Sequence, residues 1–152
     1  MKKLFLFTLL SALTISLGAC SSDDNNGSGS GSQGGIFKVT IDGVEKTFNT
    51  VDVTKDVPDE YGDVQLRVSA SINGSPDEVI TFTTWENETG TMAIYPFGYA
   101  QNGILYSDGT QTFRTNMSAN SNNYLKGTFS GTLTSQSQPK VVFTNGSFEV
   151  RY

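Results

Sequence analysis

Residues 36–48 read Ile-Phe-Lys-Val-Thr-Ile-Asp-Gly-Val-Glu-Lys-Thr-Phe. Apolar and polar residues alternate on both sides of Asp42-Gly43, which places successive side chains on opposite faces of an extended chain. An Asp-Gly pair between two such runs is typical of a two-residue hairpin turn, because both turn residues must adopt positive φ. The stretch therefore predicts two antiparallel strands, 36–41 and 44–48.

The same two-residue period continues through the rest of the chain, and no window shows a sustained helical period. Turn residues separate the runs, and eight to nine strands at this spacing are typical of an all-β domain. We expect a single antiparallel β-sandwich or barrel-like domain with up-and-down connections, since these are the shortest. Beyond the hairpin, the expected strands are 66–72, 79–85, 91–97, 104–106, 111–117, 124–134 and 141–152.

Glycines inside two of these strands predict local features. Gly127 and Gly131 fall on the inward face of 124–134, where a missing side chain would let a bulky aromatic residue or another strand approach closely. Asn145-Gly146 is either a hairpin turn or a bulge within one long strand. We favour the bulge, because an isolated glycine in a strand often marks one.

The N-terminal residues resemble a lipoprotein export signal. Lys2 and Lys3 precede an apolar stretch over 4–17, which is shorter than the roughly 20 residues of a membrane span. Leu17-Gly18-Ala19-Cys20 then resembles the lipobox of bacterial lipoproteins. This resemblance implies that 1–19 are a signal peptide and that Cys20, the sole cysteine of the chain, is lipidated.

Residues 20–35 are expected to be a flexible tether, because they contain only Ser, Asp, Asn, Gly and Gln after Cys20 and cannot form a core. Ser21 resembles an outer-membrane sorting context, and Asp23-Asp24 resembles the acidic signature of surface lipoproteins in Bacteroidota. We therefore expect a lipid-anchored outer-membrane protein, on its periplasmic or its cell-surface face, with its β domain at 36–152.

Three segments of that domain support a wider resemblance: Val39-Thr-Ile-Asp-Gly-Val44, Gly127-Thr-Phe-Ser-Gly131 and Val142-Phe-Thr-Asn-Gly-Ser-Phe-Glu-Val150. With the lipobox and the tether, they resemble the small Bacteroidota envelope lipoproteins of unknown function. The resemblance implies an all-β fold and an envelope setting, and it transfers no catalytic residue.

Composition narrows the possible functions. The formal net charge is −5, and loss of Lys2 and Lys3 with the signal peptide would make it −7. An acidic chain without a basic run argues against nucleic acid and against charge-driven binding to anionic lipid. The chain has no histidine, and lipidation of Cys20 removes the thiol. These absences exclude Ser-His triads, cysteine catalysis and disulfides, and they leave a hydrolase with paired carboxylates as an alternative.

Two groups of residues are candidate sites. Carboxylates in the segment 55–63 could bind calcium through hard oxygen ligands, although the spacing differs from an EF-hand and a solvated loop is the favoured interpretation. Aromatic residues further along could stack on a sugar or hydrophobic ligand, or belong to the core. The acidic candidates are Asp56, Asp59, Glu60 and Asp63, and the aromatic candidates are Trp85, Tyr95, Tyr99 and Tyr106.

We predict a non-catalytic binding or interaction module at the outer membrane, attached through its N-terminal lipid and needing no cofactor. A glycan, a hydrophobic ligand or another envelope protein could be its partner, and its oligomeric state stays open. The alternatives are a carboxylate-dependent hydrolase and an immunity-type envelope inhibitor.

Overall fold

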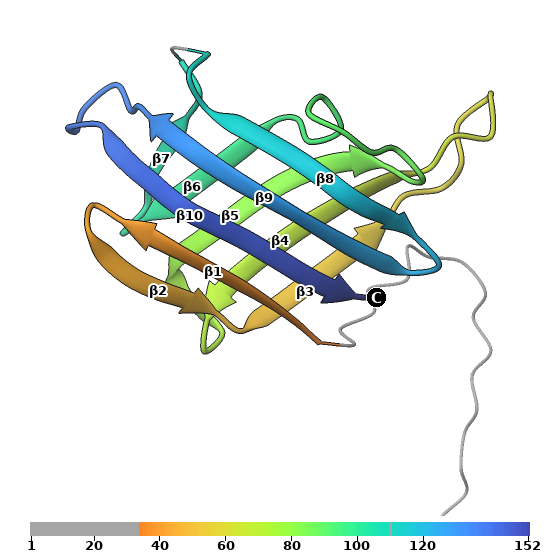
Figure 1. Cartoon of the computed structure of the whole chain (residues 1–152), viewed down its shortest axis with the longest axis horizontal. Helices are drawn as coiled ribbons and strands as arrows, with labels where there is room; N and C mark the ends of the chain where they lie inside the picture. Colours follow the sequence, from red (N-terminus) through yellow and green to blue (C-terminus); the bar gives the residue numbers. More distant parts are fainter. Residues whose placement is uncertain (1–33, 110) are drawn as a thin grey trace, which may run out of the picture.

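The computed structural model describes residues 34–109 and 111–152. Two five-stranded antiparallel sheets pack face to face, with strand orders β2-β1-β10-β9-β8 and β3-β4-β5-β6-β7 (Figure 1). The predicted all-β fold is confirmed, in its sandwich form. The strands are β1 Gly35–Ile41, β2 Val44–Phe48, β3 Thr50–Lys55, β4 Gln65–Ile72, β5 Ser75–Trp85, β6 Phe97–Gln101, β7 Ile104–Ser107, β8 Arg114–Ser121, β9 Tyr124–Leu133 and β10 Val141–Arg151.

The connectivity is up-and-down, as predicted. Each pair of hydrogen-bonded neighbours is consecutive in sequence except β1 and β10, which join the two ends of the domain. The described residues form ten strands, one more than the highest expected number, because β6 takes the place of the expected strand 91–97 and β3 was not foreseen. Only Asn49 separates β3 from β2, so the sequence contains no pair of turn residues that would predict the start of a new strand. The Asn49 side chain instead exchanges two hydrogen bonds with Asn73, at 2.7 and 2.8 Å, where the chain passes between the sheets.

The two predicted turn features are confirmed. Asp42 and Gly43 have φ values of 48° and 85°, as a tight hairpin between β1 and β2 requires. β10 is one continuous strand whose register with β9 shifts between Phe143 and Gly146, so Asn145-Gly146 is a bulge.

The predicted strand 91–97 is wrong. Residues 86–96 form a loop between β5 and β6, and regular pairing begins only at Phe97. Pro96 has no N–H to donate to a ladder, which explains why the strand cannot begin earlier. This loop follows the edge of β8, where Gly90 and Met117 exchange backbone hydrogen bonds of 2.8 and 3.0 Å.

An aromatic core fills the space between the sheets. The Phe37 and Phe148 rings of one sheet lie 5.2 Å apart, and the Phe82 ring of the other sheet lies 5.2 Å from Phe148. Gly127 makes room for this packing, because a Cβ there would lie 2.5 Å from Cζ of Phe148. The predicted close approach of an aromatic residue to Gly127 is therefore confirmed.

The predicted signal peptide, the lipidated Cys20 and all but the last two residues of the tether lie outside the described residues. Within 34–109 and 111–152, we find no helix with the length and apolar character of a membrane span.

Candidate functional site

The four candidate aromatic residues lie in two different environments. Tyr99 and Tyr106 pair across β6 and β7 and are only 0% and 5% exposed. Trp85 and Tyr95 are 42% and 81% exposed. A groove formed jointly by Tyr95, Tyr99 and Tyr106 is therefore not present, because the latter two belong to the core.

Tyr95 and Pro96 stand between two hollows on the outside of the sandwich. The first, the Trp85 hollow, has a volume of about 430 Å³, and the second, the Arg114 hollow, has a volume of about 720 Å³. Met92 lines both hollows and is 84% exposed. The polar residues that line the Trp85 hollow are Gln65, Thr83, Thr84 and Glu88. The polar residues that line the Arg114 hollow are Thr91, Ser107, Asp108, Gln111, Arg114 and Thr115.

The loop that bears Tyr95 is tied to both sheets. At its start, the buried Asn120 side chain of β8 donates from Nδ2 to the carbonyls of Trp85 and Glu88, at 2.7 and 2.9 Å. At its end, the Tyr95 N–H donates to the Thr83 carbonyl at 3.0 Å, and the Thr83 hydroxyl donates to the Tyr95 carbonyl. These bonds fix the backbone on which the exposed side chains are presented, so the surface is formed before any ligand binds.

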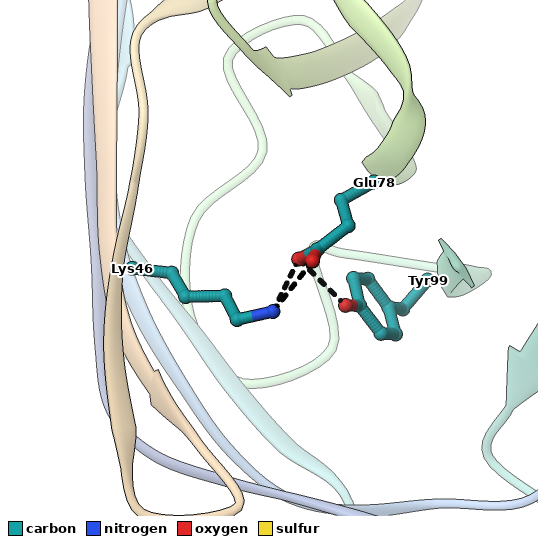
Figure 2. A network of polar contacts seen from close by, with 3 residues as sticks. All are labelled: Lys46, Glu78 and Tyr99. Atoms are coloured by element: carbon teal, nitrogen blue, oxygen red, sulfur yellow. Dashed lines mark hydrogen bonds and ion pairs between the residues drawn. The ribbon is translucent and has the colours of Figure 1, made fainter. Parts of the chain in front are cut away.

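A separate polar network connects the two sheets (Figure 2). Lys46 of β2 donates to both carboxylate oxygens of Glu78 on β5, at 2.5 and 2.7 Å. The buried Tyr99 hydroxyl donates to Oε2 of Glu78 at 2.9 Å. The Lys46 and Glu78 side chains are 17% and 21% exposed, so this ion pair is partly shielded from water.

Protonation equilibria reflect this network. Burial raises the pKa of Glu78, but hydrogen bonds from Lys46, Tyr99 and Gln101 and the charge of Lys46 outweigh burial and lower it below its ordinary value of 4.5. Burial, then the hydrogen bond to Glu78 and its charge, raise the pKa of Tyr99 well above its ordinary value. Glu78 is therefore ionised and Tyr99 neutral at pH 7, and we assign the network a structural role.

The acidic candidates are spread along the loop between β3 and β4. The Asp59 carboxylate accepts the backbone N–H groups of Tyr61 and Asp63, both at 2.9 Å, and the Asp56 carboxylate pairs with Arg67 at 2.7 Å. In the part of the chain that the structure describes, no three acidic, cysteine or histidine side chains are placed to hold a metal ion. Asp56, Asp59, Glu60 and Asp63 are thus not brought together as a calcium site.

Two residues of the Tyr95 site were not foreseen from the sequence. Met92 sits within the segment predicted as a strand, and its exposure follows from the loop that replaces it. Asn120 is a fully buried polar side chain in β8, and its hydrogen bond to Glu88 of the 86–96 loop is a tertiary contact. In the sequence, the one signal of this role is that Asn120 is a polar residue at a position of the strand that faces the core.

No family model matches the chain, and neither the curated proteins nor the solved structures give a match. The function proposed next is therefore argued from exposure, contacts and charge in the described residues.

Proposed function

We propose that this chain is an outer-membrane lipoprotein whose β-sandwich is a non-catalytic binding module, with its ligand site centred on Tyr95. The observation that carries this proposal is the exposure of Tyr95 and Met92 on a loop whose backbone is hydrogen-bonded to both sheets. Large apolar side chains held in water release free energy when a ligand covers them, at about 25 cal/mol per Å² of apolar area. A rigid scaffold with exposed aromatic loops is a common design of binding proteins.

The acids near the site favour binding over hydrolysis. Within the described residues, Glu88 is the one carboxylate lining the Trp85 hollow, and Asp108 is the one lining the Arg114 hollow. A glycosidase of the usual kind needs two carboxyl groups on opposite sides of one scissile bond. Neither hollow, as far as the described residues line it, therefore contains the pair of acids that a carboxylate-dependent hydrolase would need.

The envelope setting of the proposal rests on the lipobox ending at Cys20 and on the resemblance to small Bacteroidota lipoproteins. The thioether-linked diacylglyceryl group and an amide-linked chain would together anchor the protein stably, since two or more acyl chains suffice. The tether would then hold the sandwich away from the membrane surface.

Trp85 provides a direct assay, because it is the single tryptophan of the chain and lines one hollow. We would titrate the lipid-free domain with three ligand classes: neutral oligosaccharides, lysophosphatidylcholine below its micelle concentration, and apolar tripeptides. At least one class should change the fluorescence saturably, with loss in Tyr95→Ala and retention in Tyr95→Phe. If no class produces a saturable change, the proposed site is refuted.

A further inference from the structure

The Tyr95 site is the middle of a longer depression. A hollow of about 270 Å³ on the outer face of β3, β4 and β5, the Ser69 hollow, shares Thr83 and Pro96 with the Trp85 hollow. At the other side, a hollow of about 490 Å³ on β8, β9 and β10, the Thr128 hollow, shares Thr91, Arg114 and Thr115 with the Arg114 hollow. The four hollows therefore follow one another from one sheet, across the 86–96 loop, to the other sheet.

Hydroxyl and amide side chains line both outer hollows, beside apolar residues and, in the Ser69 hollow, Asp52 and Arg67. They occupy outward positions of the strands, where alternation places polar side chains. Such groups both donate and accept hydrogen bonds and carry no charge. In the Ser69 hollow they are Thr54, Ser69, Thr81 and Thr83, and in the Thr128 hollow they are Asn116, Thr128, Ser130, Asn145 and Ser147.

The charged groups along the depression do not favour an anion. Arg67 in the Ser69 hollow is paired with Asp56 at 2.7 Å. Arg114 donates from one guanidinium nitrogen to the backbone carbonyls of Gln111 and Phe113, at 2.7 and 3.2 Å. The chain as a whole has a formal net charge of −5. An acidic polymer would therefore meet a repulsive field and two arginines that already have partners.

We infer that the ligand of the proposed binding module is a neutral polysaccharide chain lying along these four hollows. This inference rests on the proposed function and deepens it. The C–H faces of sugar rings stack on the exposed rings of Tyr95 and Trp85 at the centre, while sugar hydroxyls exchange hydrogen bonds with the threonine, serine and asparagine side chains on both sides. The row of hollows selects a polymer, because a single sugar would occupy only one of them.

The test uses the lipid-free protein and neutral linear oligosaccharides of increasing length: the di-, tetra- and hexasaccharides of the cello, laminari, malto, xylo and manno series. Binding is followed by Trp85 fluorescence and by calorimetry. At least one hexasaccharide should bind at least tenfold more tightly than its disaccharide, because it reaches hollows beyond the centre. A uronic acid hexamer should bind at least tenfold more weakly than that hexasaccharide.

Filling the outer hollows provides the matched variants. Ser69→Tyr and Thr128→Tyr each add an aromatic ring that a strand tolerates well, and each should weaken hexasaccharide binding at least fivefold while leaving disaccharide binding unchanged. Thr47→Tyr, at an exposed position of β2 outside the four hollows, is the control and should bind like the unaltered protein.

Three results would overturn the inference: no saturable binding of any neutral oligosaccharide, equal affinity for short and long chains, or equal effects of Thr47→Tyr and Thr128→Tyr. If apolar tripeptides or the lysolipid bind at Tyr95 while all sugars fail, the binding module stands and the polysaccharide is wrong. If Tyr95→Ala binds a hexasaccharide as well as the unaltered protein does, the Tyr95-centred site is wrong as well.

Discussion

Replacing Tyr99 with phenylalanine should lower the free energy of unfolding while leaving the shape of the core unchanged. The Tyr99 hydroxyl is buried and donates to Oε2 of Glu78 at 2.9 Å, at the point where Lys46 of the other sheet also binds this carboxylate. The substitution removes a single oxygen atom from a ring that packs against Phe143 at a centroid distance of 5.3 Å. It therefore isolates the hydrogen bond from the packing.

A hydrogen bond to a charged group contributes about 1.5–3 kcal/mol net. Since Lys46 still satisfies Glu78 in the variant, we expect a loss at the lower end, about 1.5 kcal/mol. For a domain of this size, about 4 °C of Tm per kcal/mol makes the expected decrease about 6 °C. Urea unfolding followed by Trp85 fluorescence measures the loss, and the m-value should not change. Tyr106→Phe is the control, because the Tyr106 ring is also buried, at a centroid distance of 5.9 Å from Tyr99, and among the described residues no hydrogen bond joins its hydroxyl to Glu78.

The sign of the pH dependence follows from Glu78. Its pKa is lowered in the folded protein, so its contribution is present above its ordinary value of 4.5 and is lost as the pH falls through the folded pKa. Tyr99 is one cause of that lowering, so the difference between the unaltered protein and Tyr99→Phe should be largest at pH 7 and should shrink under acid conditions. Equal losses in Tyr99→Phe and Tyr106→Phe, or a difference that grows on acidification, would refute this assignment.

Three further predictions concern the scaffold and the anchor. Gly127→Ala should cost about 1–3 kcal/mol in the free energy of unfolding, because its Cβ would lie 2.5 Å from the Phe148 ring; an unchanged urea midpoint would contradict this. Asn120→Ala removes the hydrogen bond to the Glu88 carbonyl in the loop 86–96 and the one to the Trp85 carbonyl just before it, and should raise amide hydrogen exchange in the loop at least tenfold, so equal protection would show that the loop is held by other contacts. Cys20→Ala should abolish palmitate labelling in cells, and persistent labelling would disprove the lipidation proposal.

The fold was readable from the sequence because alternation is a local property. Residues 36–48 contain both strands and the turn that joins them, and each feature appears in the structure as expected. Strand β3 was missed for an equally local reason: its apolar residues are only Val51 and Val53, and Asn49 alone replaces a turn. The passage from one sheet to the other at Asn49 depends on its contact with Asn73, which is distant in sequence.

The candidate site was harder to predict, because the alternation of side chains between two faces is interrupted at Pro96. Tyr95, Phe97 and Tyr99 are each two residues apart, so a continuous strand would place all three on one face. The strand begins only at Phe97, and Tyr95, two residues earlier, lies in the loop with its side chain 81% exposed. The sequence therefore named two aromatic residues that are exposed, Trp85 and Tyr95, but could not separate them from the buried Tyr99 and Tyr106.

The inter-sheet network that stabilises the sandwich and the proposed ligand site lie at opposite ends of strand β5. Glu78 of the inter-sheet network lies near its start and Trp85 lies at its end, which at about 3.3 Å per residue places their Cα atoms roughly 23 Å apart. The two substituted residues, Tyr95 and Tyr99, are four positions apart, which places their Cα atoms at most roughly 13 Å apart, and they have different hydrogen-bond partners, Thr83 and Glu78. Substitutions more than about 7–10 Å apart without shared partners usually act additively. Tyr99→Phe should therefore weaken the fold without changing ligand affinity at Tyr95, whereas Tyr95→Ala, at an exposed position, should change affinity with less than about 0.5 kcal/mol effect on unfolding. A double variant with a non-additive unfolding energy would show that the loop and the network form one cooperative unit, and the site would then be part of what holds the two sheets together.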